Sequence, residues 1–311
     1  MIALPTAPHP AAALTDYEQR MLRSILGKLG LDDLGPHTGQ RVLEVAEYLR
    51  RRPGEGMRCR DIGPLEVEID GRIKDLGGPV ARRIMAALAL ADGAAVPDDR
   101  LIDQVWGERR PHTAINTLRV AVWRLRAALG DEARTHLQRT AAGYALTLPP
   151  DRTDHGRFTA QIEHGRTRLA AHDPHAAIAA FESALELWRG DPWSDLASTP
   201  ELAGATARLA ELRAVALEEL QAARLACGDT VTALAALRTA LTDAPYRERR
   251  WELLALALYR SGRQAEALAE LRRLRTLLIR DLALEPGLPL QTLEHRMLTQ
   301  DPTLLTPHAT T

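Results

Sequence analysis

The C-terminal half of this chain contains an internal repeat, which limits its possible folds more than any other feature. Residues 214–247 align with residues 248–281 at an offset of 34 residues. The matched positions are apolar, small, turn-forming or basic: Leu220 with Leu254, Gly228 with Gly262, Ala233 with Ala267, Leu234 with Leu268, Leu237 with Leu271, and Arg238 with Arg272. A helical unit of this length buries its apolar face only against its neighbours, so the pattern predicts stacked helical pairs.

The period, the small residues and the turn glycine are typical of the tetratricopeptide repeat. A looser copy precedes the aligned pair, with Ala177, Phe181 and Ala184 at the corresponding positions, and residues 188–202 form an insertion after it. Because such repeats build concave protein-binding surfaces, we expect an all-α domain over residues 151–300. An Ala/Leu-rich bundle that matches itself by composition is the alternative, and the constant spacing disfavours it.

The segment before the repeats has a different pattern. Residues 57–78 alternate apolar and polar side chains around Gly-Pro and Asp-Gly turns, which predicts short antiparallel strands. Helical patterns follow over 78–93, 97–107 and 112–130, and 136–148 is a predicted β-hairpin. This order predicts a winged helix-turn-helix domain over residues 57–150. In its second helix we expect Asp98 or Asp99 as the cap, and these residues facing inward: Leu101, Ile102, Val105 and Trp106.

The third of these helices has two distinct faces. Leu118, Val122, Leu125 and Leu129 are spaced by four, three and four residues, the period of a buried helix face. Asn116, Val120 and Trp123 fall on the opposite side, flanked by Arg119, Arg124 and Arg126. A solvated surface is the simpler interpretation of such a face, but an exposed tryptophan beside valine and asparagine indicates a surface that contacts a partner.

Local charge agrees with DNA as that partner. The whole chain has a net charge of −1, whereas residues 109–139 contain seven arginines and two acidic residues. Basic residues are therefore concentrated where a winged helix meets DNA, although chance clustering in an arginine-rich chain is the alternative. We expect the DNA-binding residues to lie on the third helix, its start and the hairpin: Thr113, Asn116, Arg119, Val120, Trp123, Arg124, Arg126 and Arg139.

The remaining segments complete a fold that is mainly α with a small β portion. We expect residues 1–56 to be a helical N-terminal extension, with amphipathic helices within 14–52 and disorder over the first 13 residues. Residues 301–311 are expected to be a disordered tail. Within these limits the chain is an N-terminal winged helix-turn-helix domain followed by an all-α tetratricopeptide-like domain.

Several classes of protein are disfavoured by the sequence. Cys59 and Cys227 fit no metal or disulfide spacing, and a reducing cytoplasm is the expected compartment. The N-terminus is a poor signal peptide, and no apolar run is long enough to span a bilayer. The segment LGKLG lacks the spacing of a phosphate-binding loop, so we expect no cofactor.

An enzyme is the first functional alternative, and a protein-binding scaffold is the second. His172, Asp173 and His175 could be imagined as metal ligands, but Asp173 followed by Pro174 is an ordinary helix start. No nucleophile-base motif with local context is present, so we expect no catalytic residues and no bound metal. In the scaffold alternative, the repeats bind a partner and the winged helix is not the main functional surface.

Five ordered segments carry a resemblance to a known family. They are DIGPLEVEIDGRIKDLGGP, DRLIDQVWGERRPHTAINTLRVAVWRLRAALG, GYALTL, ALELWRGDPWSDL and LALEPGLPLQTLEHRML. These segments resemble the antibiotic regulatory proteins of actinomycetes, the SARP family. The resemblance covers about residues 58–298 and leaves the helical prefix outside it.

The resemblance implies an OmpR/PhoB-type winged helix joined to a bacterial transcriptional activation domain. It further implies a pathway-specific activator of a secondary-metabolite gene cluster that binds direct repeats of double-stranded DNA as a head-to-tail pair and contacts RNA polymerase. The loop with Glu108, Arg109 and Arg110 would face the polymerase, and a grip of its arginines on phosphates is the alternative. This sequence departs from the family at Val80-Ala81, where relatives commonly have Lys-Gln, and at Trp123, where a small polar residue is common.

Overall fold

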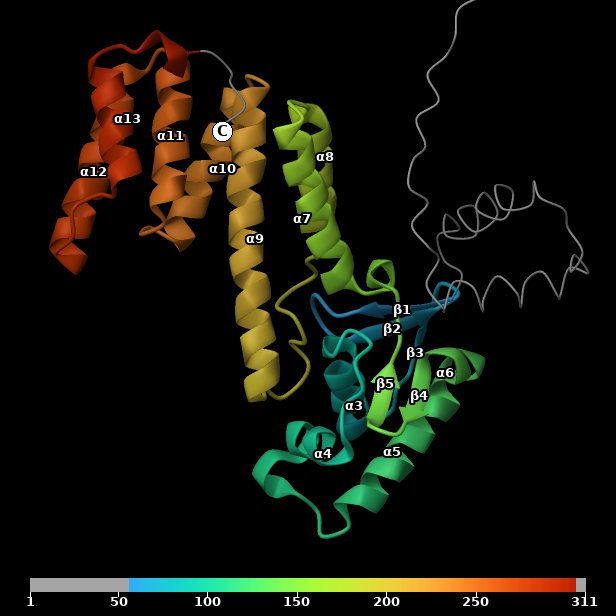
Figure 1. Ribbon diagram of the computed structural model, residues 1–311. Helices are drawn as coiled ribbons and strands as arrows, with labels where there is room; N and C mark the ends of the chain where they lie inside the picture. The colour runs from blue at the N-terminus through green and yellow to red at the C-terminus, as the bar shows by residue number, and fades with distance from the viewer. Residues whose placement is uncertain (1–55, 306–311) are drawn as a thin grey trace, which may run out of the picture. The chain divides into compact units, whose positions relative to one another are not determined.

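The computed structural model describes residues 56–305 of the chain (Figure 1). The helices expected within residues 14–52 and the end of the tail, 306–311, lie outside the described residues. The described part is mainly helical with two small β-sheets, a winged-helix region followed by a helical region, and the expected fold class is confirmed.

The winged-helix region begins with a three-stranded antiparallel sheet, the larger of the two sheets within residues 56–305. Its strands are β1 (Met57–Arg60), β2 (Glu66–Ile69) and β3 (Arg72–Lys74), with Cys59 opposite Val67 and Ile69 opposite Arg72. The turn between β2 and β3 is Asp70-Gly71, where both residues have positive φ angles, 50° and 75°. This backbone twist matches that of the flanking strands, which is why Asp-Gly favours a tight hairpin.

Helices and a second hairpin complete this region. They are α3 (Pro79–Leu90), α4 (Asp98–Trp106), α5 (Ala114–Leu129), α6 (Asp131–His136), β4 (Leu137–Thr140) and β5 (Gly143–Leu146). The hairpin β4–β5 is the wing. Val96 and Tyr144 exchange two backbone hydrogen bonds of 2.7 and 3.0 Å, which fasten the wing to the segment before α4. Gly143 is required there, because a Cβ atom at this position would lie 1.9 Å from the Val96 carbonyl oxygen.

Three local details differ from the sequence-based expectation. Helix α4 is preceded by Pro97 and has no side-chain cap, since the Asp98 carboxylate binds Arg139 of the wing instead. Trp106 is half-buried, while the other three expected inward residues of α4 are buried. Helix α6, which links α5 to the wing, was not expected, because a six-residue helix is too short to show a period.

The helical region consists of hairpins that follow one another along the chain. Its helices are α7 (Asp154–Ala170), α8 (Pro174–Leu185), α9 (Pro200–Ala226), α10 (Thr230–Asp243), α11 (Glu248–Arg260), α12 (Gln264–Leu282) and α13 (Leu288–Leu298). The repeated residues Ala233 and Ala267 are both fully buried, and Gly228 and Gly262 adopt φ angles of 80° and 75°. The predicted 34-residue repeat therefore corresponds to α9–α10 followed by α11–α12.

The first residues of the tail expected over 301–311 have a defined structure. A 3₁₀ turn (η3, Pro302–Leu304) follows α13, and Leu304 is buried in the core of the last helices. The Arg260 Nε donates a hydrogen bond of 2.8 Å to the Leu304 carbonyl, and Arg296 pairs with Asp301 at 2.8 Å. A buried apolar side chain and a guanidinium donor for its backbone hold this segment against the last helices.

Buried apolar residues form two clusters, and the division between them lies inside α9. The first cluster joins the winged-helix region to α7, α8 and most of α9, up to Ala223. The second cluster begins at Leu225 and contains α10 to α13 and η3. The winged-helix region and the first helical hairpins therefore share one core, although the sequence pattern changes from mixed to helical near residue 150.

Buried polar groups cross the junction between the winged-helix region and the helical region. His155, at the start of α7, places its Nδ1 2.5 Å from Asp61 and its Nε2 2.8 Å from Asp92. Burial alone would lower the pKa of His155, but hydrogen bonds to these two carboxylates and their charges raise it to about 9. The imidazole is therefore a cation at neutral pH, and both its N–H groups donate.

The insertion after α8 adds a second set of junction contacts. The Arg189 backbone N–H donates to the Ile62 carbonyl, and its guanidinium pairs with Glu66 at 2.9 Å. Asp195 pairs with Arg82 of α3 and also accepts a hydrogen bond of 2.7 Å from the Leu65 backbone N–H. The insertion thus holds the loop between β1 and β2 against the helical region.

Candidate nucleic-acid interface

Helix α5 presents the face that the sequence predicts for DNA. Its buried stripe of Leu118, Val122, Leu125 and Leu129 packs into the first core, with α3 and α4 against it. On the outward side, Trp123 is 68% exposed and Val120 is 50% exposed, and Asn116 is also exposed. A folded domain rarely leaves a tryptophan in water without a reason, so this face is suited to a partner.

Two of the arginines beside that face are unengaged. Arg119 and Arg124 are exposed, and neither forms an ion pair or a side-chain hydrogen bond with another residue of the described part of the chain. Both guanidinium groups therefore retain all their N–H donors. Such groups suit bidentate contacts to phosphate or to the O6 and N7 atoms of guanine.

Arg126 has a different environment from the one expected for a DNA contact. It is half-buried, its Nη2 donates a hydrogen bond of 3.1 Å to the Leu137 carbonyl, and its guanidinium lies 5.9 Å from the centre of the Tyr144 ring. These contacts connect α5 to the two strands of the wing. Arg126 thus fixes the wing relative to the helix.

The wing arginine, Arg139, is also held by its own region. It forms an ion pair with Asp98 at the start of α4, and its guanidinium lies 4.5 Å from the centre of the Tyr144 ring. Contacts with a carboxylate and an aromatic ring fix its position at the surface. A phosphate that met Arg139 would have to compete with Asp98 for the same donors.

The segment between α4 and α5 is longer than a tight helix-turn-helix turn. It contains a 3₁₀ turn (η1, Gly107–Arg109) and continues to Thr113. Glu108, Arg109 and Arg110 are all exposed. Of the three, Arg110 forms an ion pair with Asp103 of α4. Thr113 immediately precedes α5 and is exposed, with its hydroxyl 3.5 Å from that of Thr117.

One exposed apolar residue of α5 was missed by sequence analysis. Ile115, in the first turn of α5, is 45% exposed and adjoins Asn116. On the helical wheel used for the stripe, residue 115 lies about 60° from Leu118, beside the buried stripe, so helical periodicity alone would have predicted that it is buried. Its exposure in the first turn adds an apolar side chain to the surface at the start of α5.

Residues 56–305 can be searched for a metal-binding cluster and for a membrane-spanning helix. Within them, no group of three or more histidine, cysteine, aspartate or glutamate side chains is placed to hold a metal ion. Asp173 accepts a hydrogen bond of 3.1 Å from the Ala176 backbone N–H and so caps α8, as an ordinary helix start does. Of the helices described, none has the length and apolar character needed to cross a bilayer.

Comparison with known proteins places both regions in recognised families. Residues 77–146 match the C-terminal domain of transcriptional regulatory proteins, and residues 153–298 match the bacterial transcriptional activator domain. The chain is 33% identical to the transcriptional regulator RedD of Streptomyces coelicolor, over 97% of this chain and 88% of RedD. It is 32% identical to the regulatory protein DnrI of Streptomyces peucetius, over 79% of this chain and 93% of DnrI.

A solved structure of Mycobacterium tuberculosis EmbR in complex with a low-affinity phosphopeptide has a similar fold. It superposes with a TM-score of 0.75 at 33% identity, and the match covers 78% of this chain and 65% of that one. This chain therefore spans slightly less than two thirds of EmbR.

The alignment with RedD extends beyond the expected limit of the resemblance. Because it covers 97% of this chain, most of the N-terminal prefix has a counterpart in that relative, whereas the match to DnrI covers 79% of the chain. Three observations lead to the same family: the order of the two domains, the exposed face of α5, and the similarity to these relatives. The chain belongs to the SARP family of DNA-binding transcriptional regulators, which join an OmpR-type winged helix to a bacterial transcriptional activator domain and are not enzymes.

Proposed function

We propose that this protein is a pathway-specific transcriptional activator of a secondary-metabolite gene cluster, and that it acts by binding direct repeats near promoters and recruiting RNA polymerase. The observation that supports this most directly is the outward face of α5, where Trp123 and Val120 are exposed beside two unengaged arginines. The match of residues 153–298 to an activator domain supports activation over simple occupation of DNA.

The residues of the interface have different proposed roles. Asn116, Val120 and Trp123 meet base edges in the major groove, while Arg119 and Arg124 bind guanines or phosphates on either side. Thr113 is placed to donate its hydroxyl to a phosphate at the helix start. Arg139 contacts a phosphate from the wing, and Arg126 contributes by holding the wing in place.

Two copies bind head to tail on the DNA in this proposal. Each chain supplies one reading helix, so two half-sites of the same sense call for two copies in the same orientation, about one helical turn apart. The activator domain of one copy and the loop at Glu108, Arg109 and Arg110 then remain available to the polymerase. The ion pair of Arg110 with Asp103 supports a fixed loop geometry, since it ties the loop to α4.

Arginine substitutions on α5 test the DNA-binding surface. Operator fragments are selected from random DNA with the full chain, and affinity is measured by fluorescence anisotropy. Arg119→Ala and Arg124→Ala are each expected to weaken binding by about tenfold or more, because a good bidentate contact contributes roughly 1–3 kcal/mol. Arg208→Ala is the matched control, since Arg208 is an exposed arginine on α9. Unchanged affinity in both α5 variants would exclude this face as the DNA surface and favour the scaffold alternative.

The polymerase loop is tested with a triple variant in which Glu108, Arg109 and Arg110 are all alanine. The proposal predicts that its operator footprint is retained, while promoter activity in purified transcription falls by about tenfold. If footprint and transcription fall together, the arginines bind phosphates and the loop has no separate contact with the polymerase.

A further inference from the structure

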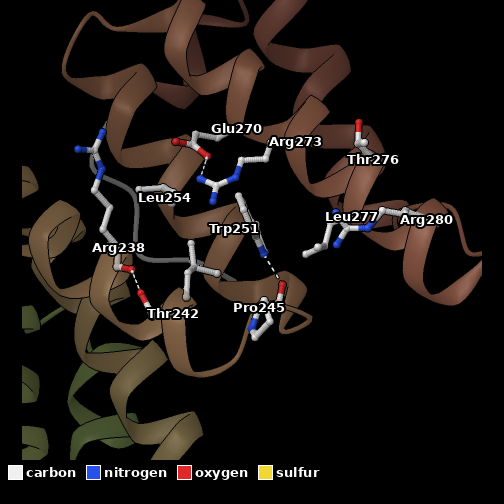
Figure 2. Close-up of a pocket in the computed structure, with 11 residues that line it drawn as sticks. Arg238, Thr242, Pro245, Trp251, Leu254, Glu270, Arg273, Thr276, Leu277 and Arg280 are labelled. Atoms are coloured by element: carbon white, nitrogen blue, oxygen red, sulfur yellow. Dashed lines mark hydrogen bonds and ion pairs between the residues drawn. The ribbon is translucent and has the colours of Figure 1, made fainter.

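A groove on the second core is distinct from the DNA-binding face. It lies between α10 and α12, with α11 as its floor and the α10–α11 loop at one end (Figure 2). Its volume is about 1020 Å³. Its lining includes Arg238 of α10, Trp251 of α11, and Glu270, Arg273, Leu277 and Arg280 of α12.

The rim of this groove is positively charged and its floor is apolar. Figure 2 shows the arginines around the central Trp251, with Arg238 on the α10 side and Arg273 and Arg280 on the α12 side. The Trp251 indole N–H already donates to the Pro245 carbonyl at 2.7 Å, so the floor offers no free donor. Three arginines face one glutamate, and an anionic ligand with an apolar part fits this combination.

The arginines are engaged to different extents. Arg238 is exposed and forms no ion pair within residues 56–305. Arg273 is 74% exposed and reaches Glu270 only at 3.5 Å, with its guanidinium 5.6 Å from the centre of the Trp251 ring. Arg280 is 68% exposed and donates from two nitrogens to its neighbour Asp281, so a ligand carboxylate competes with Asp281 there. Because all three arginines are largely exposed, a carboxylate can reach them with little desolvation of other groups.

The spacing along α12 indicates the size of the ligand. Arg273 and Arg280 are two helical turns apart, about 10.5 Å along the axis, with Thr276 and Leu277 between them. One carboxylate or phosphate cannot span this distance. A partner helix with two acidic residues seven positions apart can place one carboxylate on each arginine. An apolar residue between them then lies over Leu277.

The lining also distinguishes a helix from an extended peptide. Both threonine hydroxyls donate to carbonyls of their own helices, Thr242 to Arg238 at 3.4 Å and Thr276 to Arg272 at 3.0 Å. The groove has no strand edge, so an extended peptide would find few partners for its backbone groups. A helix satisfies its own backbone and presents only side chains, as in other helix-in-groove complexes.

We propose that this groove binds an acidic amphipathic helix of a partner protein, with carboxylates on Arg273 and Arg280 and an apolar side chain over Leu277 and Trp251. Arg238 lies on the opposite wall and reinforces the same charge preference. The groove shares no residue with the outward face of α5, so this interaction is separate from DNA binding.

A peptide-binding measurement on the full-length protein tests the proposal. The probe is a fluorescein-labelled, alanine-based helical peptide with two glutamates seven residues apart and leucines between them. We expect a Kd on the order of 10–100 µM, and a glutamine version of the peptide that binds about tenfold more weakly. Combined Arg273→Ala and Arg280→Ala substitutions should weaken binding of the glutamate peptide by about tenfold.

Matched controls separate the groove from general attraction of charges. Arg272→Ala removes an exposed arginine of the same helix that does not line the groove, and it should leave binding unchanged. Arg238→Ala, on the other wall, should weaken binding by about threefold, and it gives a second test should the α12 variant lose its helical circular dichroism. All three variants should keep wild-type operator affinity.

Other results would overturn the proposal. These are no peptide binding at about 1 mM, equal binding of the glutamine peptide, or an equal loss with Arg272→Ala. Succinate and inorganic phosphate serve as small-anion probes. If either displaces the peptide at a comparable concentration, and its own binding depends on the same arginines, the groove is a small-anion site and not a helix-binding site.

Discussion

The two buried cores of this protein are built from contacts of different range along the chain. In the first core, the buried pair of Asp61 and His155 joins residues 94 positions apart, across the junction of two regions. Near the second core, the buried pair of Glu218 and Arg250, at 3.1 Å, joins residues only 32 positions apart in consecutive repeat units. The second core therefore depends on a pattern that local sequence contains, whereas the first depends on pairings that only the complete fold creates.

The largest difference in stability between variants of the two regions is expected at two glycines with positive φ. A Cβ at Gly143 would collide with the Val96 carbonyl oxygen, whereas a Cβ at Gly262 meets nothing within 4 Å. Gly143→Ala should therefore lower the free energy of unfolding by more than about 4 kcal/mol, and Gly262→Ala by about 1 kcal/mol. Urea unfolding measures both, and hydrogen exchange should locate the first loss in the wing. Equal costs would mean that the wing accommodates the methyl group by moving.

Two tryptophans give the next contrast. Trp251 is only 3% exposed in the second core, while Trp123 lies on the surface of α5. Trp251→Ala should cost about 3–5 kcal/mol of unfolding free energy, because it leaves a cavity. Trp123→Ala should cost less than about 0.5 kcal/mol yet weaken operator binding by several fold. A substantial loss of stability in Trp123→Ala would show that this ring packs within the protein and does not contact DNA.

The junction between the winged-helix and helical regions should make the free energy of unfolding depend on pH. The pKa of His155 is raised to about 9 from an ordinary value of 6.5, so its stabilising contribution is complete below pH 6.5 and is lost as pH rises through 9. His155→Gln should lower the free energy of unfolding by about 3 kcal/mol at pH 6 and remove the decline between pH 7 and 9.5.

Two other groups help to assign this pH dependence to His155: the neighbouring carboxyl of Asp154 and the exposed histidine His295. Burial and the charge of Asp61 raise the pKa of Asp154 to about 6, so its effect falls in a separate window: stability decreases as pH rises from 4 to 6. His295→Gln, at an exposed histidine of α13, is the control and should leave the alkaline decline intact. Persistence of that decline in His155→Gln would assign it to another group.

The smallest expected effect concerns the wing arginine. Removing the Asp98 carboxylate frees Arg139, so Asp98→Ala should raise operator affinity by about two- to threefold while changing stability by less than about 1 kcal/mol. Asp99→Ala makes the same change of charge at the adjacent exposed residue, which does not pair with Arg139. An equal rise in both variants would indicate a general electrostatic effect and no role for the released arginine.

Sequence patterns predicted those features that depend on neighbouring residues. The stripe from Leu118 to Leu129 and the repeated alanines are buried as expected, because helical periodicity alone determines which side chains share a face. The family resemblance added the identity of both domains. Contacts between distant segments were not predictable in this way, and the junction of Asp61 with His155 is the main example.

The arginines of the candidate interface illustrate the same limit. Arg119, Arg124, Arg126 and Arg139 are equivalent by charge and by their position near the predicted DNA surface, yet only the first two are unengaged within residues 56–305. The other two are held by Tyr144 and by groups on other elements, the Leu137 carbonyl and Asp98. Charge in a sequence shows where arginines are, but their availability depends on packing partners that have no fixed spacing.

Helix α9 belongs to both cores, since Ala223 and residues before it lie in the first and Leu225 lies in the second. Its 27 residues form one continuous helix (Figure 1), so the angular relation between the cores follows helical geometry. Each residue inserted into the middle of α9 would rotate the second core by about 100° about the helix axis and move it by about 1.5 Å. The number of residues in α9 therefore determines the direction in which the α10–α12 groove faces relative to bound DNA.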